Sequence, residues 1–526
     1  MTTEIRKRTN RVAWMLFIGI FAIEFAAGYY VSHVIGFLHS DAISRVANAF
    51  YVLYSRDPHL GAIGFIWNPL PSFLELFFLL FYPLYPPLAS SALAGILLTS
   101  LFAGATAVLL FRTGRKFDMS VAMSLTIALL YGLNPFMFLF GANGLSDVPY
   151  MFFLILAITR FCVWIRFRAI GSLVVAAFAL AFAFWTRYEA VPFGFSFAAS
   201  IFIVVYLMQR DKEYSWKEKW HKSEATSVLV LLPIVFSSAL WLFFNYSIMG
   251  NPFYFLNSEY SNDAAALVLK NDEQFQRIFR TPWTILQFVF EKTFWYSVPL
   301  LGVLIVRTIT GRLRDWDTAV LLLLFCAVPG LQYLLLLRQT SFGWFRYFMY
   351  VFPVVVAWIP YEMNRVGLRL RRTSFAILAG SLVVSAVMLG YAMTNPNIAP
   401  DENNYLTIKT TNEHYQRQLV ERDLARWIEV SIDGTVLTDS ASAFTILVNS
   451  REPRKYLITS DYDFRDAVLR PLDYAIDYIL IPKPLNNVQS TINMQYPDLY
   501  EKGAEWVELE REFGGLWKLY RIQREK

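Results

Sequence analysis

The chain has 526 residues, of which 56% are hydrophobic and only 17% are charged, and its mean hydropathy is +0.40. Soluble proteins contain about 25% charged residues, so this composition is unusually apolar. The apolar residues are concentrated in runs of about 20 with almost no charge, the length that crosses a hydrocarbon core of about 30 Å. We therefore expect a polytopic α-helical membrane protein, and the disordered, collagen-like and disulfide-framework classes are excluded.

The 47 Lys and Arg residues exceed the 41 Asp and Glu residues by six. A small basic excess in a membrane protein is usually a topology signal, so we expect no nucleic-acid partner. The two cysteines, Cys162 and Cys326, lie far apart in separate apolar runs. They indicate neither a metal site nor a disulfide.

About eleven membrane spans can be drawn along the chain. The basic segment MTTEIRKRTNR precedes the first span, and no small-residue cleavage site follows it. We therefore interpret the first apolar run as a membrane helix rather than a signal peptide. The expected spans are 12–33, 88–111, 119–140, 147–166, 169–186, 190–209, 226–248, 285–306, 317–337, 343–361 and 373–393.

The connections between these spans differ in their basic residues. Those on one side of the membrane hold 21 Lys and Arg residues near span ends, and those on the other side hold eight. Basic residues collect on the cytoplasmic side. We therefore expect a protein of the cytoplasmic membrane with a cytoplasmic N-terminus and an extracytoplasmic segment after residue 393.

Two outer connections, about 34–87 and 249–284, are too long for simple turns. The first contains an amphipathic stretch, AISRVANAFYVLY, and a proline-framed aromatic stretch, WNPLPSFLELFFLLFYPLYPP, which we predict to be helices lying in the interface plane. Beyond residue 393 the sequence turns polar, with a helix expected near 411–429 and several short apolar strands. The expected domains are a transmembrane module, 1–393, and a small extracytoplasmic α/β domain, 394–526.

Several ionisable residues lie at the outer ends of the predicted spans, where such groups are costly unless hydrated, paired or functional. A carboxylate there could take a proton from an incoming hydroxyl, and guanidinium groups could bind a phosphate in bidentate fashion. These candidates are Asp41 in HSDAISR, Asp147 in GANGLSDVPY, Arg187, Tyr188 and Glu189 in TRYEA, and Arg338, Arg346 and Tyr347 in RQTSFGWFRYF.

Each candidate also has a purely structural interpretation. Asp41 could cap the helix that follows it, and Asp147 could do the same before Pro149. Arg187 could form a local ion pair with Glu189, and the other arginines could be interfacial anchors. His39 is a weaker candidate, since no carboxylate stands at the spacing of a zinc site. The shared location of the charges on one face favours a functional site over these separate roles.

The pattern resembles the GT-C superfamily of membrane glycosyltransferases, which includes protein O-mannosyltransferases and the aminoarabinose transferase that modifies lipid A. The resemblance covers residues 10–393 and rests on HSDAISR, SDVPY, TRYEA and FRYFMYVFP, in that order. The stretches WNPLPSFLEL and MGNPFYFLNSEYS, the second of which contains Glu259, also resemble prokaryotic members.

The resemblance implies inverting transfer of a hexosyl or pentosyl group from a polyprenyl-phosphate donor to a glycan, lipid or protein acceptor outside the cytoplasmic membrane. It implies that Asp41 is the general base, that Arg346 and Arg187 face the phosphate, and that Asp147 and Glu189 position a metal, a sugar hydroxyl or the arginines. Some members use a divalent cation and others do not, so Mg²⁺ or Mn²⁺ on Asp41 and Asp147 stays open. The further expected substrate contacts are His39, Tyr188, Glu259, Arg338 and Tyr347.

Two other classes of protein remain alternatives. A secondary transporter or lipid flippase would place ionisable residues near the middle of the bilayer, often in repeated halves. A membrane-anchored binding protein would work through residues 394–526. The charges lie at span ends on one side of the membrane, and two long outer loops break any repeat symmetry. These features favour the transferase over the two alternative classes.

Overall fold

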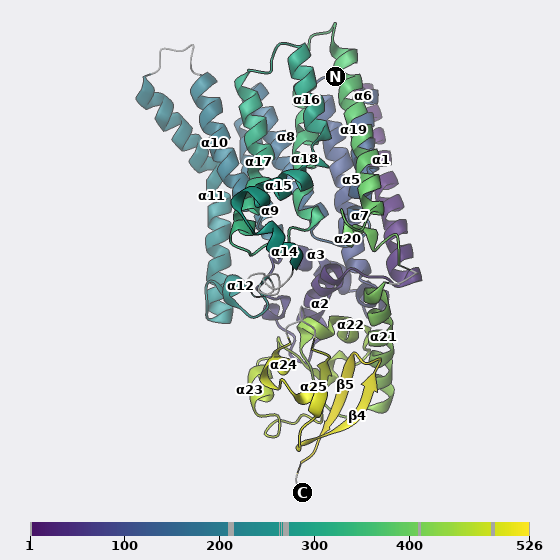
Figure 1. Ribbon diagram of the computed structural model, residues 1–526. Coiled ribbons are helices and arrows are strands. Elements are labelled where there is room, and N and C mark those ends of the chain that lie inside the picture. The colour runs from purple at the N-terminus through teal and green to yellow at the C-terminus, as the bar shows by residue number, and fades with distance from the viewer. Residues whose placement is uncertain are drawn as a thin grey trace.

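The computed structural model describes residues 3–208, 215–261, 264, 266, 273–408, 412–484 and 490–524. It consists of a long helical bundle and a small α/β module joined end to end, with the N-terminus at the far end of the bundle and the C-terminus in the module (Figure 1). Arg210, Lys212 and Lys270, which contributed to the predicted topology, lie outside the described residues.

Among the described residues, seven helical segments are long and apolar enough to cross a membrane. The first is Lys7–Ile35, made of α1 (Thr3–Tyr29) and the π-helical η1 (Tyr30–Ile35). The other six are α5 (Leu93–Lys116), α8 (Asp147–Phe167), α10 (Ala190–Met208), α11 (Trp216–Met249), α17 (Trp316–Leu337) and α19 (Arg371–Thr394). The chain is therefore a multi-pass membrane protein.

Two further spans are broken. The helices α6 (Val121–Gly132) and α7 (Pro135–Gly141) meet at 69°, and α15 (Pro282–Phe294) and α16 (Val298–Ile309) meet at 80°. Proline stands at the first position of α7 and the second position of α16, where it can start a helix but cannot continue the one before it. Counting each bent pair as one span gives up to nine in the described chain.

The predicted count of eleven spans is not confirmed. The predicted spans 169–186 and 343–361 correspond to α9 (Ile170–Thr186) and α18 (Val351–Asn364), which have 17 and 14 residues. At 1.5 Å per residue these helices are about 26 and 21 Å long, shorter than a hydrocarbon core. Both helices are apolar in composition, and hydropathy does not separate a short apolar helix from one that crosses the whole membrane.

The two amphipathic and aromatic stretches of the first outer connection are helical, as predicted. They form α2 (Ser40–Tyr54) and α3 (Leu70–Leu79), at the end of the bundle that meets the C-terminal module (Figure 1). The remaining short helices of the membrane region are η2 (Leu60–Ile63), α4 (Pro87–Ser90), α12 (Tyr254–Asn257), α14 (Glu273–Ile278) and η4 (Phe345–Phe348).

The C-terminal module contains a five-stranded sheet in the order β2-β1-β3-β5-β4. The first three strands in this order are parallel, and β5 is antiparallel to β3 and β4. The module is α/β, as predicted. Its strands are β1 (Val436–Leu437), β2 (Tyr456–Leu457), β3 (Tyr478–Pro482), β4 (Val507–Phe513) and β5 (Trp517–Ile522). Its helices are α20 (Pro400–Asn403), α21 (Glu413–Ser431), α22 (Ser440–Asn449), η5 (Pro453–Lys455), α23 (Phe464–Leu469), α24 (Thr491–Gln495) and α25 (Leu499–Lys502).

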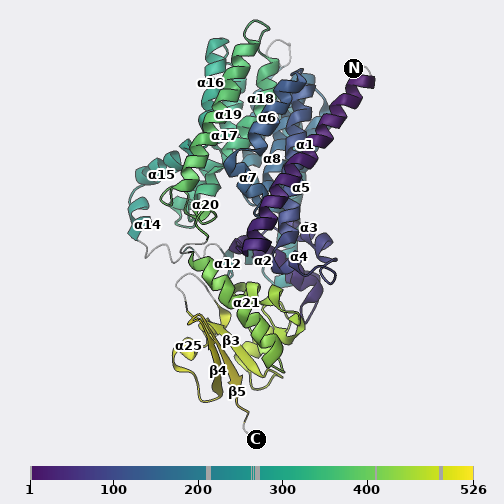
Figure 2. The same ribbon diagram turned by 90° about the vertical axis from the view of Figure 1, so that its right-hand side faces the viewer.

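The bundle and the module share one hydrophobic core. Ile43 and Phe50 of α2 belong to the same buried cluster as Ile428 of α21 and Ile446 of α22. Helix α22 packs directly against α2, and α21 packs against α22. In the side view, α21 begins beside the end of the bundle that carries α2 (Figure 2). The module is therefore packed onto the membrane region by apolar contacts.

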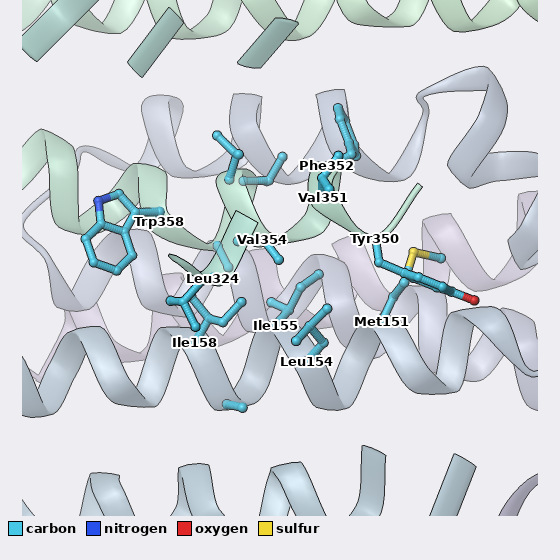
Figure 3. Packing of buried hydrophobic residues seen from close by; sticks show 14 of the residues in the cluster. Met151, Leu154, Ile155, Ile158, Leu324, Tyr350, Val351, Phe352, Val354 and Trp358 are labelled. Atoms are coloured by element: carbon cyan, nitrogen blue, oxygen red, sulfur yellow. The ribbon is translucent and has the colours of Figure 1, made fainter. Parts of the chain in front are cut away.

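A second core feature fixes the relative position of α8 and the η4–α18 segment. Met151 and Ile155 of α8 face Tyr350 and Val354 across a close-packed layer (Figure 3). The rings of Tyr150 and Tyr350 meet edge to face at 4.7 Å. This packing places the N-terminal end of α8 beside the start of α18, where the candidate charges lie.

Candidate active site

Asp41 and Arg346 form an ion pair across 305 residues of sequence. The Arg346 guanidinium donates from Nη2 to Asp41 Oδ2 at 2.5 Å. The Arg346 side chain is only 3% exposed, and its Nε and Nη1 are buried without a hydrogen-bond partner in the part of the chain that the structure describes. Arg346 therefore has donors available beyond those that hold Asp41.

The backbone at Asp41 explains why its carboxylate is free to reach Arg346. The N-cap of α2 is His39, whose Nδ1 accepts a hydrogen bond from the Asp41 N–H at 3.2 Å. Asp41 is thus in the first turn, where the helix dipole favours a negative charge, and the capping role considered for it is wrong. Its side chain stays 31% exposed, so the carboxylate lies at the edge of the buried cluster.

The electrostatics of this pair follow from burial and from Arg346. Burial alone would raise the pKa of Asp41, but its neighbours, Arg346 first and then His39 and Arg45, together outweigh burial and lower the pKa well below its usual range. Burial, together with Arg346, lowers the pKa of His39, which keeps the ring neutral and its Nδ1 able to accept.

Asp147 is at the centre of a second charged group. Its carboxylate is fully buried at the first turn of α8, and its Oδ1 accepts from the Tyr350 hydroxyl at 2.5 Å and lies 3.2 Å from Arg187 Nη1. Arg187 is also held by Glu189 through two hydrogen bonds, Nε to Oε2 at 3.2 Å and Nη2 to Oε1 at 2.8 Å. The local ion pair considered for Arg187 and Glu189 is therefore present, and it is part of this larger group.

Tyr347 joins the two charged groups. The Arg346 guanidinium lies 5.8 Å from the centre of the Tyr347 ring, and the Arg187 guanidinium lies 6.0 Å from the same ring. A cation is attracted to an aromatic face at such distances. The structure thus brings Asp41, Arg346, Tyr347, Arg187 and Asp147 into one continuous cluster.

A segment after the last membrane helix lies over this cluster. The ring of Tyr405 stacks on His39 with centroids 6.5 Å apart, and Glu402 in α20 is 2% exposed. Burial raises the pKa of Glu402 to about 8, so its carboxyl is largely protonated at neutral pH. Both Glu402 oxygens lack a hydrogen-bond partner in the described chain. No sequence pattern marks Glu402 and Tyr405 as site residues, because only the tertiary fold places them here.

Arg45 and Glu75 are further residues that the sequence analysis did not select. Arg45 stands one helical turn after Asp41, is 8% exposed, and donates from Nη1 to the Asn68 carbonyl at 3.3 Å. Glu75 of α3 is fully buried with both oxygens unpaired within the described residues, and burial raises its pKa to about 8. The i, i+4 spacing of Asp41 and Arg45 on one amphipathic helix was a signal that could have identified Arg45.

Three of the predicted contacts have other surroundings. The Tyr188 hydroxyl donates to the Ile66 carbonyl at 2.9 Å and accepts from Trp241 Nε1 at 3.1 Å, which fixes the outer loop against α11. Arg338 is exposed at the C-terminal end of α17, outside the ion pairs of the cluster. Glu259 is half-buried two residues after α12, in a loop whose next residue, Tyr260, bonds Asp439 of the C-terminal module at 2.8 Å.

The carboxylates of the cluster make a poor cation site. The described residues contain no group of three or more His, Cys, Asp or Glu side chains placed to hold a metal ion. Asp41 and Asp147 each face a guanidinium, and a positive neighbour disfavours a second cation. Asp41 and Asp147 therefore do not fit a site for Mg²⁺ or Mn²⁺.

Comparisons with known proteins bear on the fold. No protein-family model and no curated protein matches the chain. The aminoarabinose transferase ArnT from Cupriavidus metallidurans, in a crystal structure bound to undecaprenyl phosphate, matches over 96% of this chain and 97% of its own, with a TM-score of 0.54 and 12% identity.

Two other solved structures are similar to a lesser degree. ArnT in the apo state matches over 97% of this chain and 98% of its own, with a TM-score of 0.49 and 11% identity. The apo oligosaccharyltransferase of Archaeoglobus fulgidus matches over 92% of this chain and 70% of its own, with a TM-score of 0.44 and 10% identity. The first match, along nearly the full length of both chains, shows that this chain shares the fold of ArnT and so confirms the GT-C-like fold that the resemblance implied.

Proposed function

We propose that this protein is an inverting glycosyltransferase that moves a sugar from a polyprenyl-phosphate donor to an acceptor on the outer side of the cytoplasmic membrane. One observation carries the proposal: Arg346 holds Asp41 and keeps two further buried donors unpaired in the described chain. A carboxylate base and a guanidinium with donors to spare, at the end of a membrane bundle, suit a hydroxyl acceptor and a phosphate leaving group.

Asp41 acts as the general base. In the unliganded pair its pKa is lowered by Arg346, which makes the carboxylate a weak base. The donor phosphate is itself an anion and competes for the guanidinium. When Arg346 turns to the phosphate, Asp41 loses its counter-charge and becomes more basic, so donor binding prepares the base for the acceptor.

The transfer step balances without a further reactant. The acceptor O–H proton passes to Asp41, the acceptor oxygen forms a bond to the anomeric carbon, and the bond from that carbon to the phosphate oxygen breaks. The departing polyprenyl phosphate gains negative charge, which Arg346 and Arg187 stabilise. Attack opposite the leaving phosphate inverts the anomeric carbon.

The group around Asp147 positions the pair of Asp41 and Arg346. Asp147 and Glu189 hold the Arg187 guanidinium from two sides, and Tyr350 fixes the Asp147 carboxylate. Arg45, one turn from Asp41, adds positive charge where an anionic lipid headgroup would arrive. His39, Tyr347, Glu259 and Arg338 are retained as proposed substrate contacts, and Tyr188 supports the outer loop.

The carrier and the topology have separate support. The ArnT crystal structure holds undecaprenyl phosphate, which supports a polyprenyl-phosphate donor here. The distribution of Lys and Arg supports a cytoplasmic N-terminus and an extracytoplasmic module, 394–526, attached to the transmembrane module, 1–393. Glycan, lipid and protein remain the acceptor classes.

The test is mass spectrometry of envelope glycans and glycolipids from a strain that lacks this protein. We expect one sugar to be missing, which names both the sugar and its acceptor, and to return with the wild-type chain. Asp41→Asn is expected to fold and insert without restoring it, whereas Asp463→Asn, at an exposed ion pair of the module, is the matched control and restores it. Full restoration by Asp41→Asn would remove Asp41 as the base, and an unchanged envelope in the deletion strain would favour a transporter or a binding protein.

A further inference from the structure

A groove runs along the bundle in the half that lies away from the C-terminal module. It is formed by α1, α5 and α8 and has a cavity volume of about 470 Å³. In the side view, the N-terminal part of α1 and the adjoining helices occupy this far half (Figure 2). Its apolar lining includes Phe17, Leu109, Phe152 and Leu156. Such a groove on a membrane helix bundle faces lipid.

Three cations stand at one end of this groove. Arg112 and Lys116 are four residues apart on α5 and so share a face of that helix, and Arg160 approaches from α8. No acidic side chain lines the groove among the described residues. In the same part of the chain, none of the three makes an ion pair, and the Nε of Arg160 is buried without a hydrogen-bond partner.

The unpaired state of these cations contrasts with their surroundings. At the same end of the bundle, Arg307 is fully buried and paired with Asp317 at 2.7 Å and Glu362 at 2.7 Å. Arg160 lies seven residues inside the end of α8, within a span, where an unpaired guanidinium is costly. Arg160 is half-buried and has no ion-pair partner in the described chain, so its guanidinium is available to an anion that enters the groove.

We propose that this groove binds an anionic phospholipid of the adjoining leaflet. Its phosphate is held by Arg112, Lys116 and Arg160, and an acyl chain lies in the apolar part of the groove. Charge complementarity selects the occupant, because guanidinium groups bind phosphate oxygens in bidentate fashion and basic pockets between membrane helices recognise anionic headgroups. Trp14 lines the groove and is 62% exposed, as an aromatic side chain at a lipid interface is expected to be.

The groove is separate from the candidate active site. Asp41 lies in the first turn of α2, and α2 is at the end of the bundle that meets the module (Figure 1). The groove is lined by residues 105–116 of α5 and 152–163 of α8, toward the opposite ends of these helices. The proposed occupant is a structural membrane lipid and not the sugar donor. Lipid binding in the groove can therefore be tested independently of the proposed transfer reaction.

The test titrates the purified full-length protein with phosphatidylglycerol and with phosphatidylcholine, and counts bound lipid by native mass spectrometry. We expect preference for phosphatidylglycerol in the wild type. The double variant Arg112→Gln/Arg160→Gln is expected to bind phosphatidylglycerol about 25-fold more weakly than the wild type, roughly fivefold for each cation removed. Arg369→Gln, an exposed cation at the same end outside the groove, is the matched control and is expected to bind like the wild type.

A second pair of variants keeps the test decisive if the double variant does not fold. Ala105→Phe fills the apolar part of the groove without changing charge and is expected to lose the lipid, whereas Arg160→Lys is expected to keep it. Equal phosphatidylglycerol binding by wild type and Ala105→Phe overturns the proposal. Equal affinity of the wild type for the two phospholipids overturns the proposal as well. It is also overturned if the variants lose binding of undecaprenyl phosphate but keep binding of phosphatidylglycerol.

Discussion

Gln418 and Leu38 exchange two hydrogen bonds between the C-terminal module and the segment that leads into the candidate site. The Leu38 N–H donates to Gln418 Oε1 at 3.1 Å, and Gln418 Nε2 donates to the Leu38 carbonyl at 2.6 Å. Leu38 directly precedes His39, the N-cap of α2, and Asp41 follows two residues later. Helix α21 therefore holds the backbone that positions the proposed base.

The first prediction concerns this contact. Gln418→Ala leaves the buried polar groups of Leu38 unpaired, which costs about 1–3 kcal/mol of stability. We expect a lower melting temperature and a lower rate of sugar transfer, because the start of α2 is no longer held. Gln416→Ala, an exposed position on the same helix, is the control and is expected to change neither. A Gln418→Ala protein with wild-type melting and transfer would show that the module does not support the site.

The second prediction concerns Tyr350. Tyr350→Phe removes the hydrogen bond to the buried Asp147 carboxylate, and a bond to a charged group contributes about 1.5–3 kcal/mol. We expect kcat to fall by about tenfold or more, since Asp147 no longer holds Arg187 in place, with a smaller change in KM.

Tyr150→Phe is the matched control for this variant. The two rings pack edge to face, but the Tyr150 hydroxyl has no hydrogen-bond partner in the described chain. It should leave kcat unchanged. Equal effects of the two substitutions would indicate that Tyr350 acts through packing alone.

The third prediction is a dependence of stability on pH. Burial raises the pKa of Glu402, and separately of Glu75, to about 8 from an ordinary value of 4.5. The folded protein therefore keeps protons that the unfolded chain releases between these values. The free energy of unfolding contributed by these groups is fully present below pH 4.5, falls as pH rises, and is lost by about pH 8.

Melting curves from pH 5 to pH 9 test this dependence. The wild type is expected to melt at progressively lower temperature up to about pH 8. Glu402→Gln and Glu75→Gln are each expected to reduce the slope, and the double variant most of all. A double variant with the wild-type slope would mean that these carboxyls are not protonated in the folded state.

The sequence predicted the parts of this structure that depend on local pattern. The strands of the module are short apolar runs in a polar segment, and the first outer connection contains an amphipathic and an aromatic stretch, so the strands and the helices were both predicted. The span count was not confirmed because hydropathy does not record the short lengths of α9 and α18.

The candidate site was predictable only in part, for a physical reason. Asp41, Asp147, Arg187 and Arg346 are charges at span ends, and topology alone suggested that they share a face. Glu402 and Tyr405 follow the last span in an ordinary polar segment. The stacking of Tyr405 on His39 and the burial of Glu402 depend on how the chain returns to the bundle, which no local pattern encodes.

The most direct test of the account is the affinity of the purified protein for undecaprenyl phosphate in the wild type, Arg346→Gln and Asp41→Asn. Because Arg346 is proposed to pass from Asp41 to the donor phosphate, Arg346→Gln is expected to weaken binding by about tenfold or more. Asp41→Asn frees the guanidinium and is expected to bind at least as tightly as the wild type. Binding by Arg346→Gln that equals the wild type would contradict the account.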